Sequence, residues 1–409
     1  MLNPKQLQEI RQSFAFFNRK ISSDTVIYFD NAATTQKLSV VLDCLTELWT
    51  EGSANVHRSS HGRANQLTQR FEKARSYAAS FINAEHSSEV IWTTGATEGI
   101  NLVANSWGNA QIHAGDQILI SAMEHHANIL PWQQLCERRG AELKIIPLTD
   151  NSELDLDALD SLLSEKIKLL AITHVSNVLG TINPIKKIVE KCQTYPCKVL
   201  VDGAQAAAHI PIDVQDLNCD FYVFSGHKCF APEATGVLYG KKQLLTSMPV
   251  WKVGGEMVKT VTFNSAEFQA PPLRFEAGTP NISGVIAFAE ALNFLKKLDQ
   301  DALAHHEQSL RQLLEHHLSK IQGIEIYSRA KNRCSLVTFS IKGCESMDIA
   351  TLLSEQNIAV RSGQLCAMPL VKSYHPNGVL RVSLAFYNSE QEVSQFMKAL
   401  LVAIELLRE

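Results

Sequence analysis

The stretch that decides the fold is KVLVDGAQAAAHIPIDVQDLNCDFYVFSGHK, residues 198–228. Lys198–Val201 and Phe221–Phe224 are short runs rich in β-branched and aromatic residues, which favours two strands. The first run is apolar on both faces, as expected for a parallel strand that is covered by helices on each side. Asp202 ends the first strand, and Lys228 closely follows the second. The sequence therefore predicts two buried strands whose carboxyl ends carry an acid and a base.

The same pattern extends outward on the N-terminal side. Short apolar runs alternate with longer amphipathic stretches, which predicts βαβ units around a mostly parallel sheet. The further strands expected are Val90–Trp92, Gln117–Ser121, Leu143–Pro147 and Lys168–His174.

Helices are expected on either side of this region. Apolar residues recur at helical spacing from Ala64 to Phe81 and from Val393 to Leu407. Ser389 and Glu392 fit a capping box that opens the last helix. Phe263–Pro280 is predicted to be a loop leading into a C-terminal α+β domain, with a strand at Ser335–Ser340 and an apolar run near Ile358–Val360.

Composition excludes several classes of protein. The 409 residues suggest about two or three domains. With 38 Lys and Arg against 42 Asp and Glu, the net charge is −4, and no broad basic surface for nucleic acid or membranes is indicated. The N-terminus lacks a signal-peptide pattern, and no apolar run is long enough to cross a membrane, so we expect a cytoplasmic protein.

The nine cysteines show no disulfide or zinc pattern, because they are irregularly spaced and contain no C-x-x-C pair. We predict no metal site. The pairs His305-His306 and His316-His317 are interpreted as solvated residues on the polar face of a helix. The open question is whether one of the nine thiols is a nucleophile, since most reduced cysteines are buried small hydrophobes.

Ligands of open α/β sheets bind beyond the carboxyl ends of the strands. Thr93–Asn101 is expected to form a glycine-bearing turn that opens a helix, which suits a phosphate, although in isolation a plain N-cap by Thr94 or Thr97 is the favoured explanation. A buried Asp202 needs a cation nearby, and a protonated ring nitrogen would serve. Lys228, with Ser225 and His227 beside it, supplies an amine and two donors to an anion. These groups are what pyridoxal phosphate requires.

The order of motifs along nearly the whole chain resembles the cysteine desulfurases of the SufS/CsdA type, which are fold-type I pyridoxal phosphate enzymes of the class V aminotransferase group. The motifs that carry this resemblance are Tyr28–Ala33, Asn55–Arg58, Glu124–Asn128, Asp202–Gln205, Ser225–Lys228, Arg274–Asn281, Arg361–Leu370 and Arg381–Asn388.

The resemblance implies an α/β fold with a large, mostly parallel sheet of the seven-stranded type and a smaller α+β domain. Residues 26–285 would form the large domain, and residues 1–25 and 286–409 the small one. It also implies a homodimer, a cysteine or selenocysteine substrate, and a small sulfur-acceptor protein of the SufE/CsdE type.

The resemblance also implies roles for individual residues. Lys228 would bind the cofactor covalently and move the substrate's Cα proton, and Cys366 would be the nucleophile that becomes a persulfide. The cofactor would be held by Asp202 at the pyridine nitrogen, Gln205 near the ring hydroxyl, His125 stacked on the ring, Thr97, Ser225 and His227 at the phosphate, and Thr279 reaching the phosphate from the partner subunit. Asn177 and Arg381 would bind the substrate, Arg381 through its carboxylate.

Three positions depart from the usual family pattern. Ala96 removes a hydroxyl near the phosphate, Leu365 stands where relatives often have histidine, and Phe230–Gly236 replaces a more glycine-rich loop and adds Glu233. Two alternatives stay open: another pyridoxal phosphate lyase or aminotransferase that does not use Cys366, and a catalytically weak cofactor-binding interaction protein. Activity on selenocysteine or cysteine sulfinate, and delivery of sulfur to iron–sulfur clusters, a molybdenum cofactor or tRNA, also stay open.

Overall fold

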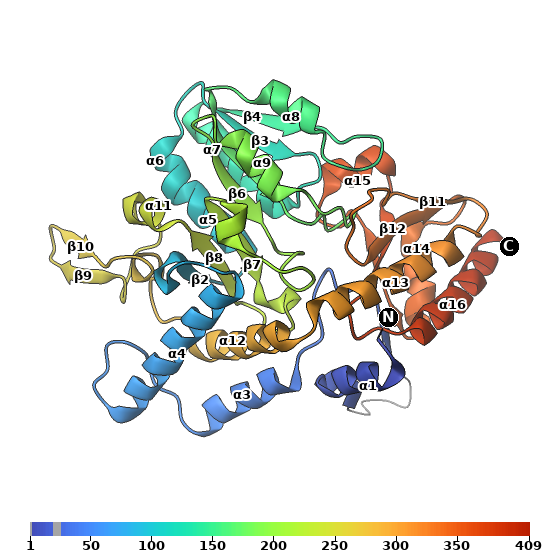
Figure 1. The fold of residues 1–409 in the computed structure, drawn as a ribbon, viewed down its shortest axis with the longest axis horizontal. Helices are drawn as coiled ribbons and strands as arrows, with labels where there is room; N and C mark the ends of the chain where they lie inside the picture. The colour runs from blue at the N-terminus through green and yellow to red at the C-terminus, as the bar shows by residue number, and fades with distance from the viewer. Residues whose placement is uncertain (1, 19–25) are drawn as a thin grey trace.

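The computed structural model describes residues 2–18 and 26–409. Its larger lobe is built on a seven-stranded sheet with the strand order β2-β8-β7-β6-β5-β3-β4 (Figure 1). The strands are β2 (Val90–Thr93), β3 (Gln117–Ser121), β4 (Glu142–Ile146), β5 (Ile167–Thr173), β6 (Lys198–Asp202), β7 (Phe221–Ser225) and β8 (Gly236–Gly240). The six strands expected from the sequence are confirmed to within one residue at nearly every end.

The sequence pattern missed β8. This strand pairs antiparallel with both β2 and β7, whereas the other neighbouring pairs are parallel. The class expected from the sequence, a mostly parallel α/β sheet, is confirmed.

Helices cover both faces of this sheet. One face packs on α3 (Ser39–Thr50), α4 (Gly62–Phe81), α8 (Leu156–Leu162), α9 (Ile185–Cys192), α10 (Val214–Leu217) and α12 (Ile282–Lys297). The other packs on α5 (Ala96–Val103), η2 (Ala104–Gly108), α7 (Leu130–Arg139) and α11 (Lys242–Ser247), with α6 (Asn109–Gln111) following η2. This double cover explains why the central strands are apolar on both sides.

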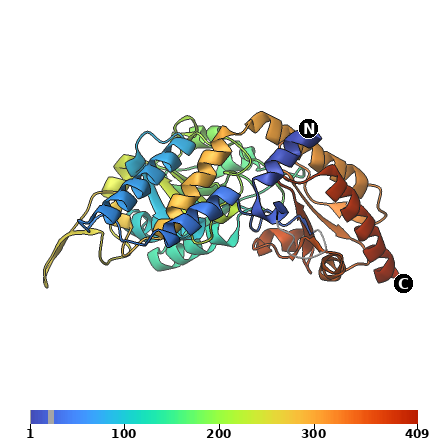
Figure 2. The same ribbon diagram turned by 90° about the horizontal axis from the view of Figure 1, so that it is seen from below.

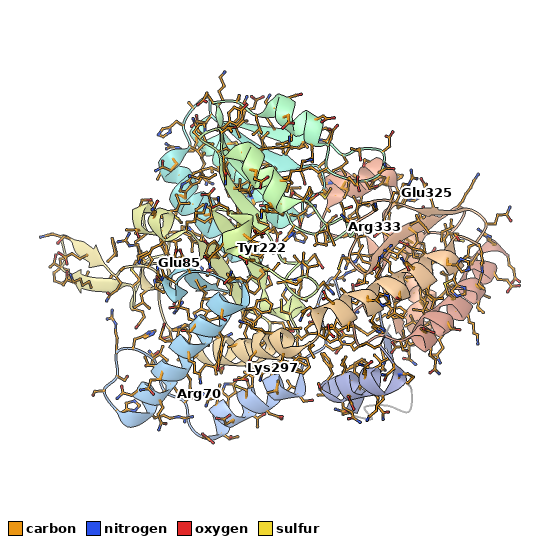
Figure 3. All side chains as sticks on the ribbon, viewed as in Figure 1. Arg70, Glu85, Tyr222, Lys297, Glu325 and Arg333 are labelled. Carbon is orange, nitrogen blue, oxygen red and sulfur yellow. The ribbon has the colours of Figure 1, made fainter. Side chains whose placement is uncertain are left out.

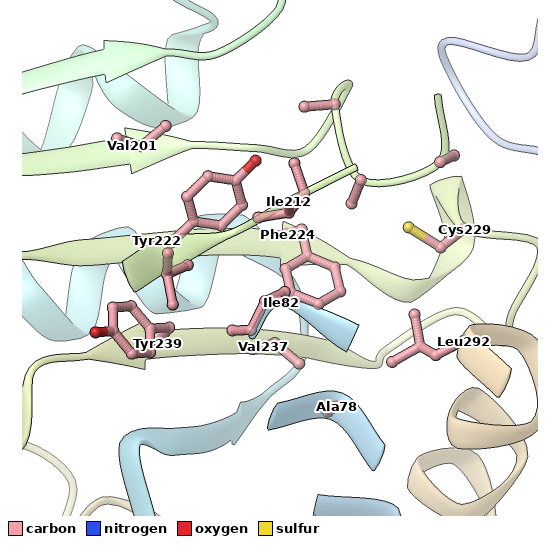
Figure 4. Close-up of a cluster of buried hydrophobic side chains, with 14 of the residues drawn as sticks. Ala78, Ile82, Val201, Ile212, Tyr222, Phe224, Cys229, Val237, Tyr239 and Leu292 are labelled. Carbon is pink, nitrogen blue, oxygen red and sulfur yellow. The ribbon is translucent and has the colours of Figure 1, made fainter. Parts of the chain in front are cut away.

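Alternate residues of the central strands enter opposite cores. Val201, Tyr222 and Phe224 lie in the core against α4 and α12, whereas Leu200 and Val223 lie in the other. Figure 4 shows the first core, where Tyr222 and Phe224 project from β7 into the same cluster as Ala78, Ile82 and Leu292. The two cores fix the strands from both sides, and with them the loops at their carboxyl ends.

The smaller lobe has an antiparallel sheet in the order β11-β12-β15-β14. Its strands are β11 (Ile324–Ile326), β12 (Leu336–Ile341), β14 (Arg361–Gly363) and β15 (Val379–Ser383), and its helices are α13 (Gln300–Leu318), α14 (Ser346–Glu355), α15 (Met368–Tyr374) and α16 (Glu390–Arg408). The expected strand near residues 335–340 and the Ser389/Glu392 capping box are confirmed. The apolar run near residue 358 forms β13 (Ile358–Ala359), which pairs with β1 (Ile27–Tyr28) rather than joining the main sheet of this lobe.

The N-terminal helices α1 (Pro4–Gln12) and α2 (Ala15–Asn18) lie beside the small lobe, where Arg11 forms an ion pair with Glu392 at 3.0 Å (Figure 2). Helix α12 continues past residue 285 to Lys297 and packs along its length against α3 and α4. The domain division between residues 285 and 286 stays a prediction, and the segment 19–25 at its other boundary lies outside the described residues.

Two local expectations were wrong. The stretch 263–280 is not only a loop, because β10 (Ala266–Phe268) pairs with β9 (Val258–Val261) in a hairpin that projects at the left of Figures 1 and 2. His306 is not solvated: it is buried, and its Nε2 lies 3.0 Å from the carbonyl oxygen of Asn388. The apolar face of α13 turns this histidine inward. Within the described ranges, no helix is long and apolar enough to cross a membrane.

Candidate active site

A cavity of about 560 Å³ lies at the carboxyl ends of β5, β6 and β7, facing the small lobe. Its volume is typical of a site for a small ligand. The cavity is lined by every site residue predicted from the sequence except Thr279, namely Thr97, His125, Asn177, Asp202, Gln205, Ser225, His227, Lys228, Cys366 and Arg381. Residues from both lobes therefore meet at one place.

The buried Asp202 and the partly buried Lys228 form the charged centre of this cavity. Burial raises the pKa of the Asp202 carboxyl, an effect that the Ala204 N–H, donating to Oδ1 at 2.9 Å, and the positive charge of Lys228 partly offset. Burial lowers the pKa of Lys228, against the opposing influence of Asp202. The lysine amine is thus easier to deprotonate than an exposed lysine, which suits a nucleophile or a base.

The N-terminus of α5 and the end of β7 meet at one side of the cavity. The Ala96 N–H donates to the Ser225 Oγ at 2.8 Å, and Thr97 lines the cavity beside it. Gly95 has a φ of 151°, and a Cβ on Gly236 would lie 2.5 Å from the Gly95 Cα, so this close approach requires glycine at both positions. Hydroxyl groups and a helix N-terminus favour an anion here.

His227 lies next to this anion-binding corner. Burial, together with the charges of Lys228 and Lys37, lowers its pKa to about 4. Its carbonyl oxygen accepts hydrogen bonds from the Thr35 backbone N–H at 2.9 Å and from the hydroxyl of Thr34 at 3.1 Å. The N-terminal segment thereby fixes the turn that carries Lys228.

His125 is held as a neutral ring. Burial and the neighbouring charge of Lys228 lower its pKa to about 3. The Ala127 N–H donates to Nδ1 at 3.0 Å, so the ring proton belongs on Nε2. A neutral, oriented imidazole at this edge can stack against a planar ligand without placing a second cation next to Lys228.

Gln205 and Asn177 are buried polar side chains with one clear partner each. The Gln205 Nε2 donates to the Ala32 carbonyl oxygen at 2.7 Å. The Asn177 Nδ2 donates to the Leu365 carbonyl oxygen at 2.7 Å. Asn177 therefore also ties the large lobe to the loop that carries Cys366.

Arg381 comes from β15 of the small lobe and is almost fully buried. It donates from Nη1 to the Asn177 carbonyl oxygen at 2.8 Å and from Nη2 to the Asp30 Oδ1 at 3.1 Å. Its Nε is buried and has no hydrogen-bond partner within the described part of the chain. A guanidinium with an unused buried donor that lines a cavity is suited to bind a carboxylate.

Asp30 and Arg361 also belong to this group, although no sequence pattern pointed to them. Arg361 lies directly opposite Arg381 in the β14–β15 pair and lines the cavity, and its Nε lies 3.5 Å from the Asp30 Oδ2. Asp30 thus holds two arginines at the cavity. Both residues belong to motifs that carry the family resemblance, Tyr28–Ala33 and Arg361–Leu370, but spacing alone does not show that these segments meet.

Cys366 is the one exposed cysteine among the described residues, where seven others are buried and Cys344 is half-buried. Leu365 and Cys366 have φ values of 50° and 54°, so the loop turns sharply at the thiol. The loop is held in place because the His126 N–H donates to the Cys366 carbonyl oxygen at 2.7 Å and the Met368 N–H donates to the His126 Nε2 at 2.9 Å. After Asp30 and Arg361, His126 is a third residue at this site that no sequence pattern pointed to.

The departures from the family pattern have local consequences. Leu365 points into a small apolar cluster with Met123, Leu370 and Val371, so it anchors the loop by packing. Ala234 adopts a φ of 52°, a left-handed conformation that costs a non-glycine residue about 1 kcal/mol. Glu233 forms a 3.1 Å ion pair with Lys37.

Thr279 does not line the cavity. It is exposed and lies 3.5 Å from the Asn55 Nδ2. A role for Thr279 in this site requires a second subunit.

Together these groups fit pyridoxal phosphate: a buried carboxylate for the pyridine nitrogen, an amine of lowered pKa for the aldehyde, a neutral imidazole for the ring, and a helix N-terminus with two hydroxyls for the phosphate. The partnerless Nε of Arg381 leaves a donor for a substrate carboxylate.

His174, buried at the end of β5, gives the fold an acid-sensitive point. Burial lowers its pKa from 6.5 to about 4, and its Nδ1 lies 3.0 Å from the Tyr222 hydroxyl. Below pH 6.5 the unfolded chain binds a proton that the folded protein does not take up until about pH 4, so stability falls as the pH drops through this window. At about pH 5, His174 should cost about 2 kcal/mol of unfolding free energy relative to pH 7.

Urea unfolding of the His174→Gln variant at about pH 7 and about pH 5 measures this contribution. The variant should lose less stability on acidification than the parent, whereas the exposed-site control His113→Gln should behave like the parent. An equal acid loss in all three proteins would contradict the assignment.

Comparison with known proteins agrees with the geometry. The family described as aminotransferase class V matches residues 27–396. A cysteine desulfurase from Cronobacter sakazakii is 44% identical over 402 residues, covering 98% of this chain and 99% of the relative. The crystal structure of the cysteine desulfurase CsdA from Escherichia coli has a TM-score of 0.91 at 37% identity and covers 99% of both chains. The apo structure of a cysteine desulfurase from Thermococcus onnurineus has a TM-score of 0.92 at 32% identity and covers 100% of this chain and 99% of that one. The chain therefore belongs to the class V aminotransferase family and, within it, to the pyridoxal-phosphate-dependent cysteine desulfurases.

Proposed function

We propose that this protein removes sulfur from L-cysteine, releases L-alanine and carries the sulfur as a persulfide on Cys366. The observation that supports this most is the position of Cys366: the exposed thiol lines the cavity that also contains Lys228, Asp202 and Arg381. A sulfur carrier has to reach both a bound substrate and an external acceptor. An exposed thiol on a loop that lines the cavity can reach both.

When bound, pyridoxal phosphate supplies an electron sink for the substrate's Cα. In the proposed arrangement, Asp202 would keep the pyridine nitrogen protonated, His125 would cover the ring and Gln205 would lie near the ring hydroxyl. The phosphate would be held by Thr97, Ser225 and His227. These assignments use the buried charges and donors on the carboxyl edge of the large sheet.

Lys228 has two tasks in this proposal. Its Nζ would hold the cofactor covalently, and as a free amine the same Nζ would accept the proton from the substrate's Cα. Burial lowers the pKa of Lys228, which favours the neutral amine that can accept this proton. The protonated Nζ would then be able to donate this proton back later in the reaction.

Arg381 and Asn177 orient the substrate. The Arg381 guanidinium, which is already held by Asp30 and the Asn177 carbonyl, binds the substrate carboxylate. This contact aims the substrate sulfur at the Cys366 loop. The pair of arginines around Asp30 adds positive potential at the same end of the cavity.

Cys366 performs the sulfur transfer. Its thiolate attacks the substrate sulfur, a new S–S bond forms, and the electrons of the broken C–S bond pass to the carbon fragment, which takes up protons and leaves as alanine. An acceptor thiolate then attacks the outer sulfur of the persulfide, takes that sulfur and releases the Cys366 thiolate. Regeneration of the Cys366 thiolate requires a reducing compartment, and we infer that the protein works in the cytoplasm.

We further infer that a homodimer completes the site and that a small protein with its own exposed cysteine accepts the sulfur. The exposed Thr279, outside the cavity of its own chain, would then serve the phosphate of the partner subunit. Sedimentation equilibrium should give a mass about twice the 45.4 kDa of one chain, and a concentration-independent monomer would contradict the inference.

The function is tested by incubating the purified holoenzyme with L-cysteine and a reducing thiol. Alanine and sulfide should appear in equal amounts, and mass spectrometry without reductant should find one added sulfur on the peptide that contains Cys366. Pyruvate and ammonia in place of alanine would identify a different pyridoxal phosphate lyase.

A further inference from the structure

Three side chains that the proposed reaction does not use converge where the two lobes meet. His209 lies in the turn after β6, Glu307 on α13, and Cys334 in the segment just before β12. One imidazole nitrogen, one carboxylate oxygen and the thiol sulfur all lie within 4.8 Å of one another. None of the three lines the active-site cavity.

The cluster is shielded from solvent and held in a fixed geometry. The side chains of His209 and Glu307 are 9% and 6% exposed, and Cys334 is buried. The His209 Nδ1 lies 3.1 and 3.0 Å from the two carboxylate oxygens of Glu307. The Ser335 hydroxyl donates to the Glu307 Oε2 at 2.9 Å, which orients the carboxylate.

The local electrostatics favour a positive charge at this point. The Glu307 carboxylate and the Cys334 thiol both face the His209 imidazole in this shielded cluster. A proton on the imidazole is one way to meet this preference. A cation held by the three donor atoms is another.

We propose that His209, Glu307 and Cys334 form a binding site for a soft divalent cation of the Zn²⁺ type. Thiolate sulfur, imidazole nitrogen and carboxylate oxygen are the ligands that zinc prefers, and hard cations such as Mg²⁺ do not choose a thiolate. A thiolate, a carboxylate and a neutral imidazole carry two negative charges, which balance the ion. The Ser335 hydroxyl on Glu307 supplies the second hydrogen-bonding layer that metal ligands normally have.

The site would link the two lobes, because His209 belongs to the segment that continues β6 whereas Glu307 and Cys334 belong to the small lobe. Figure 3 shows the two sides of this junction, with Tyr222 on the large sheet and Arg333, the neighbour of Cys334, near α13. The cation would therefore stabilise the relative position of Asp202 and Arg381, which lie on opposite lobes. The sequence pattern could not reveal the site, since His209 and Glu307 are 98 residues apart.

The test measures bound metal in the holoenzyme. The parent protein carries Cys366→Ser, so that the exposed active-site thiol does not bind metal itself. After equilibrium dialysis against buffer with low zinc, the protein should retain about one zinc ion per chain. Co²⁺ in its place should give the long-wavelength absorption of a tetrahedral thiolate complex.

Two variants in the same parent test the ligands, and a third variant is the matched control. Cys334→Ser and Glu307→Gln keep the size of the side chain and should each lower retained zinc at least tenfold and abolish the cobalt spectrum, whereas Cys344→Ser, at a half-buried cysteine outside the cluster, should retain both. If either ligand variant does not fold, the other decides. Absence of zinc from the parent, or retention unchanged in a folded ligand variant, overturns the proposal.

Discussion

Replacing Lys228 with alanine should lower alanine formation from L-cysteine by at least about 1,000-fold. The change removes the atom that holds the cofactor and also the base that moves the Cα proton, so added amines should restore only part of the rate. The purified variant should also lose the visible absorption band that borohydride bleaches in the parent. Steady-state alanine assays and absorption spectra before and after borohydride measure both effects.

Lys37 provides a matched control for this substitution. Like Lys228, it is a partly buried lysine whose pKa is lowered by burial, and its Nζ lies 3.3 Å from the His227 carbonyl oxygen, but it does not line the cavity. Lys37→Ala should keep the borohydride-sensitive band. Lys228→Arg, which keeps a cation beside Asp202, should fold like the parent and be as inactive as the alanine variant. If the band survives in Lys228→Ala, or disappears only in Lys37→Ala, the assignment of the cofactor to Lys228 is wrong.

Much of this site could be predicted because parallel strands place their carboxyl ends at one edge. The run that ends at Asp202 and the run before Lys228 are adjacent in the sequence, and β6 and β7 are adjacent in the sheet. A local pattern of buried strands followed by polar residues is therefore enough to bring the acid and the base together. Ser225 and His227 follow from the same argument.

The remaining part of the site depends on contacts between distant segments. Asp30 reaches Arg381 across 351 positions in the sequence, and Asn177 reaches the Leu365 carbonyl across 188. Such contacts follow from how the small lobe packs on the large one, and no periodicity or spacing encodes that packing. The motifs identified the segments that take part, but not the hydrogen bonds and ion pairs that join them.

The antiparallel strand β8 shows a second limit of sequence patterns. Gly236–Gly240 is short, starts and ends with glycine, and follows the turn of Lys228 without a helix, so the βαβ pattern stops there. Its position is set by close packing, because Gly236 contacts the Gly95 backbone. The strand therefore supports the anion-binding corner although its own sequence predicts little.

The role of Leu365 also depends on tertiary packing. As a departure from the family pattern, it removes an imidazole that would lie next to the thiol. In the structure it is buried with Met123 and Leu370 and anchors the loop by packing, while the Asn177 amide and the His126 backbone N–H hold the loop by hydrogen bonds. The loop is thus positioned without help from a histidine at 365, and the adjacent thiol stays exposed.

This geometry leads to the second large effect. Cys366→Ala should lower alanine formation from L-cysteine by at least about 100-fold, because no other exposed thiol among the described residues lies at the cavity to attack the substrate sulfur. The persulfide seen by mass spectrometry should disappear with it. Cofactor binding should persist, since Lys228 lies in the turn just after β7 and the Asp202 carboxyl is held by the Ala204 N–H, both on the large lobe.

Selenocysteine separates loss of the nucleophile from general damage to the site. A selenol ionises more readily than a thiol and is the better leaving group, so its release does not require attack by Cys366. Cys366→Ala should therefore turn over selenocysteine within a few-fold of the parent rate while it fails on cysteine, and Cys344→Ala should be normal on both substrates. Equal losses on both substrates would show that the substitution damages the cavity, and unchanged cysteine turnover would show that sulfur leaves by a route without Cys366. The split between the two substrates, rather than inactivity alone, is what assigns sulfur transfer to this residue.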